Sequence, residues 1–427
     1  MPIVEPSPGL VRAIGRWSLA ALVINSIIGS AVFGLPSILA GLLGTASPYA
    51  VLLGAVGIGI IMACFAEVGS QFREPGGPYI YARESFGRFV GLEVGWLAWL
   101  VRMTATAASA NLFVNYFAEF WPAASSPLPR IALLTAIVGL LAYVNYRGVR
   151  GGTTTSNVFT VAKLLPLLIF VCLGLVFLAR SSPPQPSEPE SADWLKSVLL
   201  LVFAYGGFEA ALMPTGEVKN PRRDTPFALF TALITVTVVY VLVQVVVVGT
   251  LADPQSTNRP LATAAHVFIG SGGAALITIG ALISVFGYIS AAMLNVPRLT
   301  YAFAERKDFP KLFSRVHPKF KTPHVSIAAF ALLVWALAVA GSFQWNASVS
   351  AAARLLTYGT VCAAVLKLRK DKPDADAFRL PLGKGIAVLG IFVSLFPVSA
   401  MGITEFVVIA LTTVIAFSHW LVVRKAT

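Results

Sequence analysis

Long apolar stretches alternate with short polar connections along the whole chain. A helix that crosses a membrane needs about 20 predominantly apolar residues, and twelve stretches approach that length, the last two close enough that eleven is the alternative. Their approximate bounds are 17–40, 49–69, 89–117, 131–146, 157–179, 194–214, 227–251, 274–304, 325–340, 347–368, 386–401 and 405–423. The pattern predicts an all-α polytopic membrane protein with about 12 transmembrane helices.

Composition narrows the class further. Of the 427 residues, 57% are hydrophobic and only 12% are charged, about half the charged share of a soluble globular protein. These figures exclude a soluble enzyme, a disordered chain, a coiled coil and a collagen-like rod, and a membrane β-barrel would show short alternating segments instead. Cys64, Cys172 and Cys362 lie in apolar runs without metal-site spacing, so we expect buried small hydrophobic residues and no metal or other cofactor.

The distribution of positive charge predicts the orientation in the membrane. With the N-terminus inside, 25 of the 32 Lys and Arg residues fall in cytoplasmic segments and four in external ones, while Arg102, Lys163 and Arg354 lie within apolar stretches. The positive-inside rule therefore predicts a multi-pass protein of the cytoplasmic membrane with both termini cytoplasmic. The net charge of +13 then reflects cytoplasmic loops and anionic lipid rather than a nucleic-acid partner.

Two of the predicted helices are interrupted at mid-membrane depth. Gly, Ser and Pro cluster at 25–36 in the first stretch, and paired glycines with a carboxylate stand at 203–209 in the sixth. Unwound backbone is tolerated in a membrane where it lines a cavity, and such pairs mark transporter sites. The alternative is close helix packing through small residues. The five-helix spacing of the two breaks fits an inverted five-plus-five repeat.

Several motifs together resemble a known family. Ile-Gly-Ser-Ala-Val-Phe at 28–33, Pro-Gly-Gly-Pro-Tyr-Ile-Tyr at 75–81 and Glu-Val-Lys-Asn-Pro-Arg-Arg at 217–223 are similar to signatures of the amino acid–polyamine–organocation (APC) transporters. Within them, the chain resembles bacterial amino acid permeases related to the arginine/agmatine antiporter group. The resemblance implies a LeuT-type fold in a single transporter domain, 1–427, with inverted repeats at 17–179 and 194–368, broken helices 1 and 6, and two accessory helices at 386–423.

The resemblance also implies a substrate site at the two helix breaks. The substrate carboxylate is expected at the backbone of Gly29, Ser30 and Ala31, and its ammonium at carbonyl groups near Ile27, Phe203 and Gly206. Ala31 stands where the family usually has glycine, and its methyl group narrows the pocket or shifts the unwound turn.

Lys163, on the fifth predicted helix, has two interpretations. An ammonium inside the membrane is costly and usually functional, but this one is near enough to the inner end to snorkel. Several members of the resembled family carry a lysine where sodium-coupled relatives bind a cation. On that reading, Lys163 replaces the ion, makes transport sodium-independent and is able to exchange a proton.

Further polar residues are expected around the same site. By the resemblance, Arg102 falls at a pocket-lining position, and Thr106 follows one turn later on the same helix face. The Arg102 guanidinium either faces the substrate or pairs with Glu209. Glu209, the one clear carboxylate at mid-depth, either titrates during transport or is a fixed partner of Arg102 or Arg354. Ser350, one turn before Arg354, is a further candidate for lining the pocket.

The function that fits these features is secondary active amino acid transport by alternating access, coupled to H⁺ or working by exchange. Excess positive charge at the site favours neutral amino acids, with a polyamine or cationic amino acid antiporter as the alternative. A channel is a rival from a different class, although no carbonyl-filter sequence appears. An intramembrane enzyme is not expected, because three of the four histidines are in loops and none accompanies a mid-membrane nucleophile.

Overall fold

The computed structural model describes residues 14–72, 76–148, 153–181, 188–212, 218–373 and 377–424, with the side chains of 153–163 and 210–211 left out. The regular secondary structure of the described residues is helical, apart from one isolated bridge between Ile14 and Val218. The first half comprises α1 (Arg16–Ile27), α2 (Ala31–Leu43), α3 (Ser47–Gly69), α4 (Pro78–Phe86), α5 (Arg88–Phe117), α6 (Pro127–Arg147) and α7 (Thr153–Arg180). The second half comprises α8 (Trp194–Tyr205), α9 (Phe208–Ala211), α10 (Pro221–Thr250), α11 (Pro260–Ile269), α12 (Ser271–Glu305), α13 (His324–Ala340), α14 (Phe343–Asp371), α15 (Gly383–Leu395) and α16 (Ile403–Arg424).

Within the described residues, every apolar stretch predicted from the sequence is largely helical, and the first and sixth are interrupted. Eight helical stretches of the described chain are long and apolar enough to cross a membrane, and others, such as α8 and α13, are shorter apolar helices. The all-helical, multi-pass prediction is therefore confirmed. Between α10 and α12, the short helix α11 has one face buried against α12.

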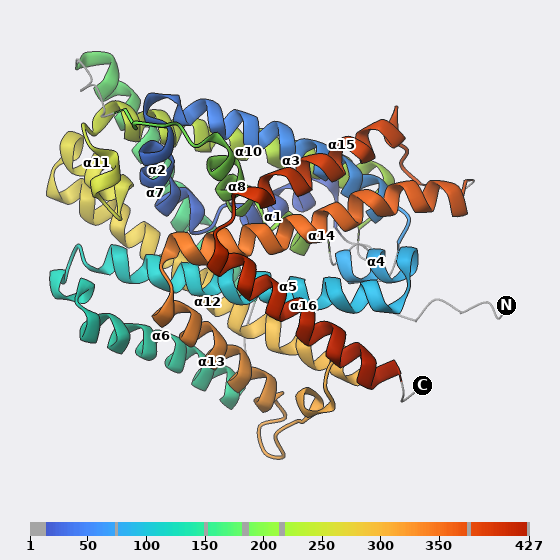
Figure 1. The fold of residues 1–427 in the computed structure, drawn as a ribbon. Coiled ribbons are helices and arrows are strands. Elements are labelled where there is room, and N and C mark those ends of the chain that lie inside the picture. The colour runs from blue at the N-terminus through green and yellow to red at the C-terminus, as the bar shows by residue number, and fades with distance from the viewer. Residues whose placement is uncertain are drawn as a thin grey trace.

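Helices α5 and α14 form the centre of the bundle, packed extensively against each other. Around them lie α3, α4, α8, α12 and α16, while α6 and α13 pack on an outer side (Figure 1). Figure 1 shows α4 and the end of α16 at one end of the bundle, the α4 end, and α11 at the other, the α11 end. Peripheral α16 exposes apolar side chains such as Phe406 and Leu411, as expected for a helix that faces lipid.

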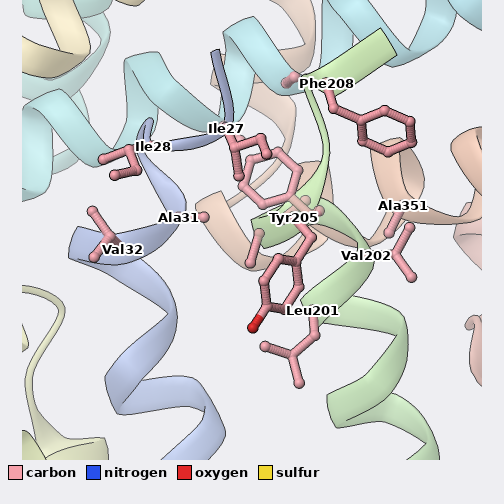
Figure 2. Packing of buried hydrophobic residues seen from close by; sticks show 14 of the residues in the cluster. Ile27, Ile28, Ala31, Val32, Leu201, Val202, Tyr205, Phe208 and Ala351 are labelled. Atoms are coloured by element: carbon pink, nitrogen blue, oxygen red, sulfur yellow. The ribbon is translucent and has the colours of Figure 1, made fainter. Parts of the chain in front are cut away.

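The two helix breaks predicted from the sequence are present and face each other (Figure 2). The first separates α1 from α2, and the second separates α8 from α9, with α1 in contact with α9. Gly207, in the second break, has a φ of +113°, and a Cβ there would overlap the backbone carbonyl oxygen of Ser26. Glycine is therefore required at this position both by the backbone conformation and by the close approach of α1.

The cysteines differ from expectation at one position. Cys64 and Cys362 are buried between helices, but Cys172, on α7, is exposed. Its expected burial is wrong because the apolar run there faces outward from the bundle, where lipid rather than protein covers it.

Candidate functional site

The centre of the bundle holds a cavity between α4, α5, α9, α12 and α14. Its polar lining includes two arginines and one carboxylate, and its walls near the α4 end are aromatic. The lining residues on which the argument depends are Tyr79, Trp99, Arg102, Glu209, Arg354 and Tyr358. Charged side chains thus stand at the middle of the helical bundle, next to the second helix break.

Glu209, on α9, is fully engaged. One carboxylate oxygen, Oε2, accepts from the Tyr358 hydroxyl and from the Gly207 amide, both at 2.9 Å. The other, Oε1, lies 3.5 Å from Nη2 of Arg354. All three side chains are buried, so the carboxylate is stabilised by charge and by hydrogen bonds together. The sequence left open whether Glu209 titrates or is a fixed partner of Arg102 or Arg354. In this structure, Glu209 pairs with Arg354.

Arg354 is less well satisfied than its partner. Its side chain is buried, yet Nε and Nη1 have no acceptor among the described residues. The guanidinium lies directly against Gly206, where even a methyl group would overlap it. Gly206 therefore makes room for a buried cation at the α8–α9 break.

Arg102 lies half-buried on α5 and lines the same cavity. No hydrogen bond or ion pair joins its guanidinium to the part of the chain that the structure describes, so the direct pair with Glu209 is not formed. Thr106 and Ser350 instead hold the α5 backbone. The Thr106 hydroxyl donates to the Arg102 carbonyl at 2.7 Å, and the Ser350 hydroxyl donates to the Val101 carbonyl at 3.2 Å.

The first helix break lies outside this cavity. No backbone carbonyl of the described chain accepts from the amides of Gly29, Ser30 or Ala31, so they are free to bind a ligand. Ser30 accepts from the Ser109 hydroxyl at 3.0 Å. Ala31 lines a separate small space between α2, α3, α8 and α10, together with Tyr240.

The three positions expected to hold an ammonium are already engaged. The Tyr240 hydroxyl donates to the Ile27 carbonyl at 3.3 Å, and the Gly206 amide donates to the Phe203 carbonyl at 3.3 Å. Gly206 itself is covered by the Arg354 guanidinium. Lys163, on α7, lies outside the residues whose side chains are described.

Sequence reasoning missed two polar groups of the cavity. Tyr358 lies four residues after Arg354 on α14, and that i,i+4 spacing is the signal that could have placed both on one helix face. Trp99, three residues before Arg102 on α5, has an indole N–H without an acceptor in the described chain. Tyr358 holds the Glu209 carboxylate, and Trp99 adds a donor to the lining of the cavity.

The α4 end of the cavity is bounded by a buried charge network. Tyr79 donates to Asp308, which also pairs with Arg83 at 2.8 Å and with Arg88 at 3.2 Å. Burial, followed by the Asp308 carboxylate, raises the pKa of Tyr79 to about 12. The phenol is therefore protonated at physiological pH, and it ties α4 to the loop after α12.

Comparison with known proteins agrees with this architecture. The chain matches the amino acid permease family over residues 14–423. It is 28% identical over 411 residues to the serine/threonine exchanger SteT of Bacillus subtilis (strain 168), covering 93% of this chain and 92% of that protein. It is 27% identical over 424 residues to the arginine/agmatine antiporter of Chlamydia pneumoniae, covering 92% of this chain and 86% of that protein. It is 29% identical over 397 residues to the large neutral amino acids transporter small subunit 2 of Mus musculus, covering 87% of this chain and 74% of that protein. Taken with the helix breaks and the central cavity, these matches show that the chain belongs to the amino acid permease family of the APC superfamily, whose members are amino acid transporters and not enzymes.

Proposed function

We propose that this transporter moves neutral amino acids across the cytoplasmic membrane by alternating access. In this proposal, the chain is one transporter domain of about twelve spans, with a LeuT-type arrangement of inverted repeats at 17–179 and 194–368 and accessory helices at 386–423. Both termini are cytoplasmic, as the distribution of Lys and Arg supports. The α4 end then faces the cytoplasm.

The arrangement of the cavity supports an inward-facing state. The cavity extends from Glu209 toward Tyr79 on α4. Toward the α11 end, Phe343 packs edge-on against Phe203 with ring centroids 6.0 Å apart, and it approaches so closely that a Cβ on Gly34 would lie 2.6 Å from its ring. Rearrangement of these contacts would open the opposite side of the site, as alternating access requires.

The charge of the cavity is the observation that carries the substrate assignment. Two arginines, Arg102 and Arg354, stand against one carboxylate, Glu209, in the cavity lining. Arginine stays protonated in proteins, and like charges in a partly desolvated cavity repel strongly. A dibasic substrate would add further positive charge, whereas a zwitterion adds none and an acidic substrate brings a negative charge to the excess. The expected order is therefore neutral first, acidic second and dibasic last.

The relatives divide on the same question. The activities of the serine/threonine exchanger and the large neutral amino acid transporter support a neutral substrate, whereas that of the arginine/agmatine antiporter favours the alternative, a cationic amino acid or polyamine. The guanidinium of Arg102, which lines the cavity without an ionic partner among the described residues, weighs against that alternative.

Coupling is proposed from Lys163. A lysine at that position on α7 would take the place of a sodium ion, so transport would be sodium-independent and either linked to protons or driven by exchange. Glu209, held by Tyr358 and Arg354, is the second group proposed to take part in coupling, since a change of conformation that separates this cluster would alter its affinity for a proton.

Uptake by the purified full chain in proteoliposomes tests the proposal. Each of the twenty amino acids is offered in radiolabelled form, with and without imposed Na⁺ and H⁺ gradients. We expect saturable uptake of neutral amino acids and accelerated exchange when unlabelled substrate is inside. Non-saturable flux without counterflow would indicate a channel and would contradict the proposal, as would uptake restricted to dibasic compounds.

A further inference from the structure

The guanidinium of Arg354 has donors for which the described residues provide no acceptor. The side chain is 4% exposed, and Nε and Nη1 have no acceptor among the described residues. Leaving charged donors buried and unpaired is costly. An acceptor that reached these two nitrogens from the cavity would therefore bind with a favourable free energy, because the buried guanidinium has little contact with solvent.

Glu209 does not meet that need. Its Oε1 atom lies 3.5 Å from Nη2 of Arg354, too far for a strong hydrogen bond, and its Oε2 atom already accepts from Gly207 and Tyr358. Arg102, in the same cavity lining, has no anionic partner in the described chain. The cluster of two arginines and one carboxylate thus carries an excess of one positive charge, which one carboxylate from a ligand would neutralise.

The position of the guanidinium excludes a ligand cation from the same place. Nη1, Cζ and Nε of Arg354 are the atoms that a Cβ on Gly206 would meet, so this cation rests on the break between α8 and α9. An ammonium bound beside Gly206 would face a permanent positive charge and would be repelled. A carboxylate there would be attracted, and a small separation of α14 from Gly206 would admit it.

We propose that Arg354 is a second carboxylate-binding residue of the transport site, in addition to the free amides of the first helix break, and that it determines specificity. The ligand class is then small monocarboxylates, recognised with or without an α-amino group: neutral α-amino acids and the matching 2-oxo acids. This inference rests on the proposed function for its amino acid ligands, and it extends the ligand class beyond amino acids.

Matched ligand sets test the inference on the purified full chain. Each set has an amino acid, its 2-oxo acid and its carboxylate-free amine: L-alanine, pyruvate and ethylamine; L-leucine, 4-methyl-2-oxopentanoate and 3-methylbutylamine; L-phenylalanine, phenylpyruvate and 2-phenylethylamine. Binding is measured by the concentration dependence of thermal stabilisation in detergent. In at least one set we expect the oxo acid to bind within about tenfold of the amino acid and the amine not to bind, because a charge-assisted hydrogen bond contributes about a tenfold factor or more.

Variants assign that recognition to Arg354. R354Q is expected to weaken oxo-acid and amino-acid binding by about tenfold or more, and R354K by less. Since R354Q leaves Glu209 without its cation, the double variant R354Q/E209Q keeps the pair neutral and serves if the single variant fails to fold. R259Q is the matched control, because Arg259 forms a partly buried pair with Glu119 at 2.8 Å and does not line the cavity, and it should bind like the wild type.

The outcomes separate this inference from the proposed function. Binding of amines without binding of oxo acids, or unchanged affinity in R354Q/E209Q, would overturn the role of Arg354. Oxo-acid binding that depends on Arg354, together with absence of amino acid uptake in proteoliposomes, would uphold the inference and overturn the proposed function. Absence of binding by every probe in all three sets would overturn the inference.

Discussion

Replacing Gly207 by alanine should disrupt the contact between the two helix breaks. The φ of Gly207 is +113°, and an added Cβ would overlap the backbone carbonyl oxygen of Ser26. A non-glycine residue in such a conformation costs of order 1–3 kcal/mol, and the overlap is with backbone, which cannot rotate away as a side chain can. Relief requires α1 and α9 to separate at their contact.

Gly29 provides the matched control in the other break. The nearest atom to a Cβ there is the Ile27 carbonyl oxygen at 3.9 Å, an ordinary van der Waals distance. Alanine at position 29 is therefore accommodated without overlap, and only a bulky side chain such as leucine is expected to obstruct the free amides of the first break. The two glycines thus differ in what surrounds them, although each lies in a helix break.

Thermal unfolding of the purified chain in detergent measures the difference. We expect Gly207→Ala to lower the apparent Tm by about 5 °C or more, since a loss of a few kcal/mol shifts the Tm of a large domain by several degrees. Gly29→Ala should remain within about 1 °C of the wild type. Transport by Gly207→Ala should be lost even where protein remains in the membrane. Equal Tm values and uptake rates for both variants would refute the reasoning about the breaks.

Further predictions concern coupling, pH and stability. Uptake should proceed without sodium, and Lys163→Ala should impair proton-linked uptake; a strict sodium requirement in the wild type would contradict this. The pKa of Tyr79 is raised to about 12, so its hydroxyl ionises less readily in the folded protein than in the unfolded chain. The Tm of the wild type should therefore exceed that of Tyr79→Phe by a constant amount below pH 10, and this difference should shrink between pH 10 and pH 12. Arg369 binds buried Glu67 through two hydrogen bonds of 2.6 and 2.7 Å. Arg369→Ala should lower the free energy of unfolding by about 3–5 kcal/mol. Its Tm should fall much more than that of Lys367→Ala, which removes only an exposed i,i+4 pair.

The sequence predicts the helices of this protein well because each has to be apolar over its membrane depth. The breaks are also predictable, since Gly, Ser and Pro at mid-depth are unfavourable unless a cavity uses them. Sequence could not place Tyr79 against Asp308, 229 residues away, because that contact depends on how α4 packs on the loop after α12. The outward position of Cys172 was missed for a related reason: lipid-facing and core-facing surfaces are both apolar.

The charged cluster shows where sequence reasoning reaches its limit at the site. Three intramembrane charges, Arg102, Glu209 and Arg354, could be identified as unusual from hydropathy alone. Which arginine pairs with the carboxylate depends on helix rotation within the bundle, and the structure selects Arg354. That choice leaves Arg102 facing the cavity, which is the basis of the substrate proposal.

Competition for uptake tests the central claim, that the positively charged cavity selects against dibasic substrates. Labelled neutral amino acid is taken up into proteoliposomes while unlabelled neutral amino acids, arginine or agmatine compete. The account predicts strong inhibition by neutral amino acids and weak inhibition by arginine and agmatine in the wild type, with discrimination relaxed in Arg102→Ala and retained in the control Arg259→Ala. Potent inhibition by arginine or agmatine, with none by neutral amino acids, would contradict the account.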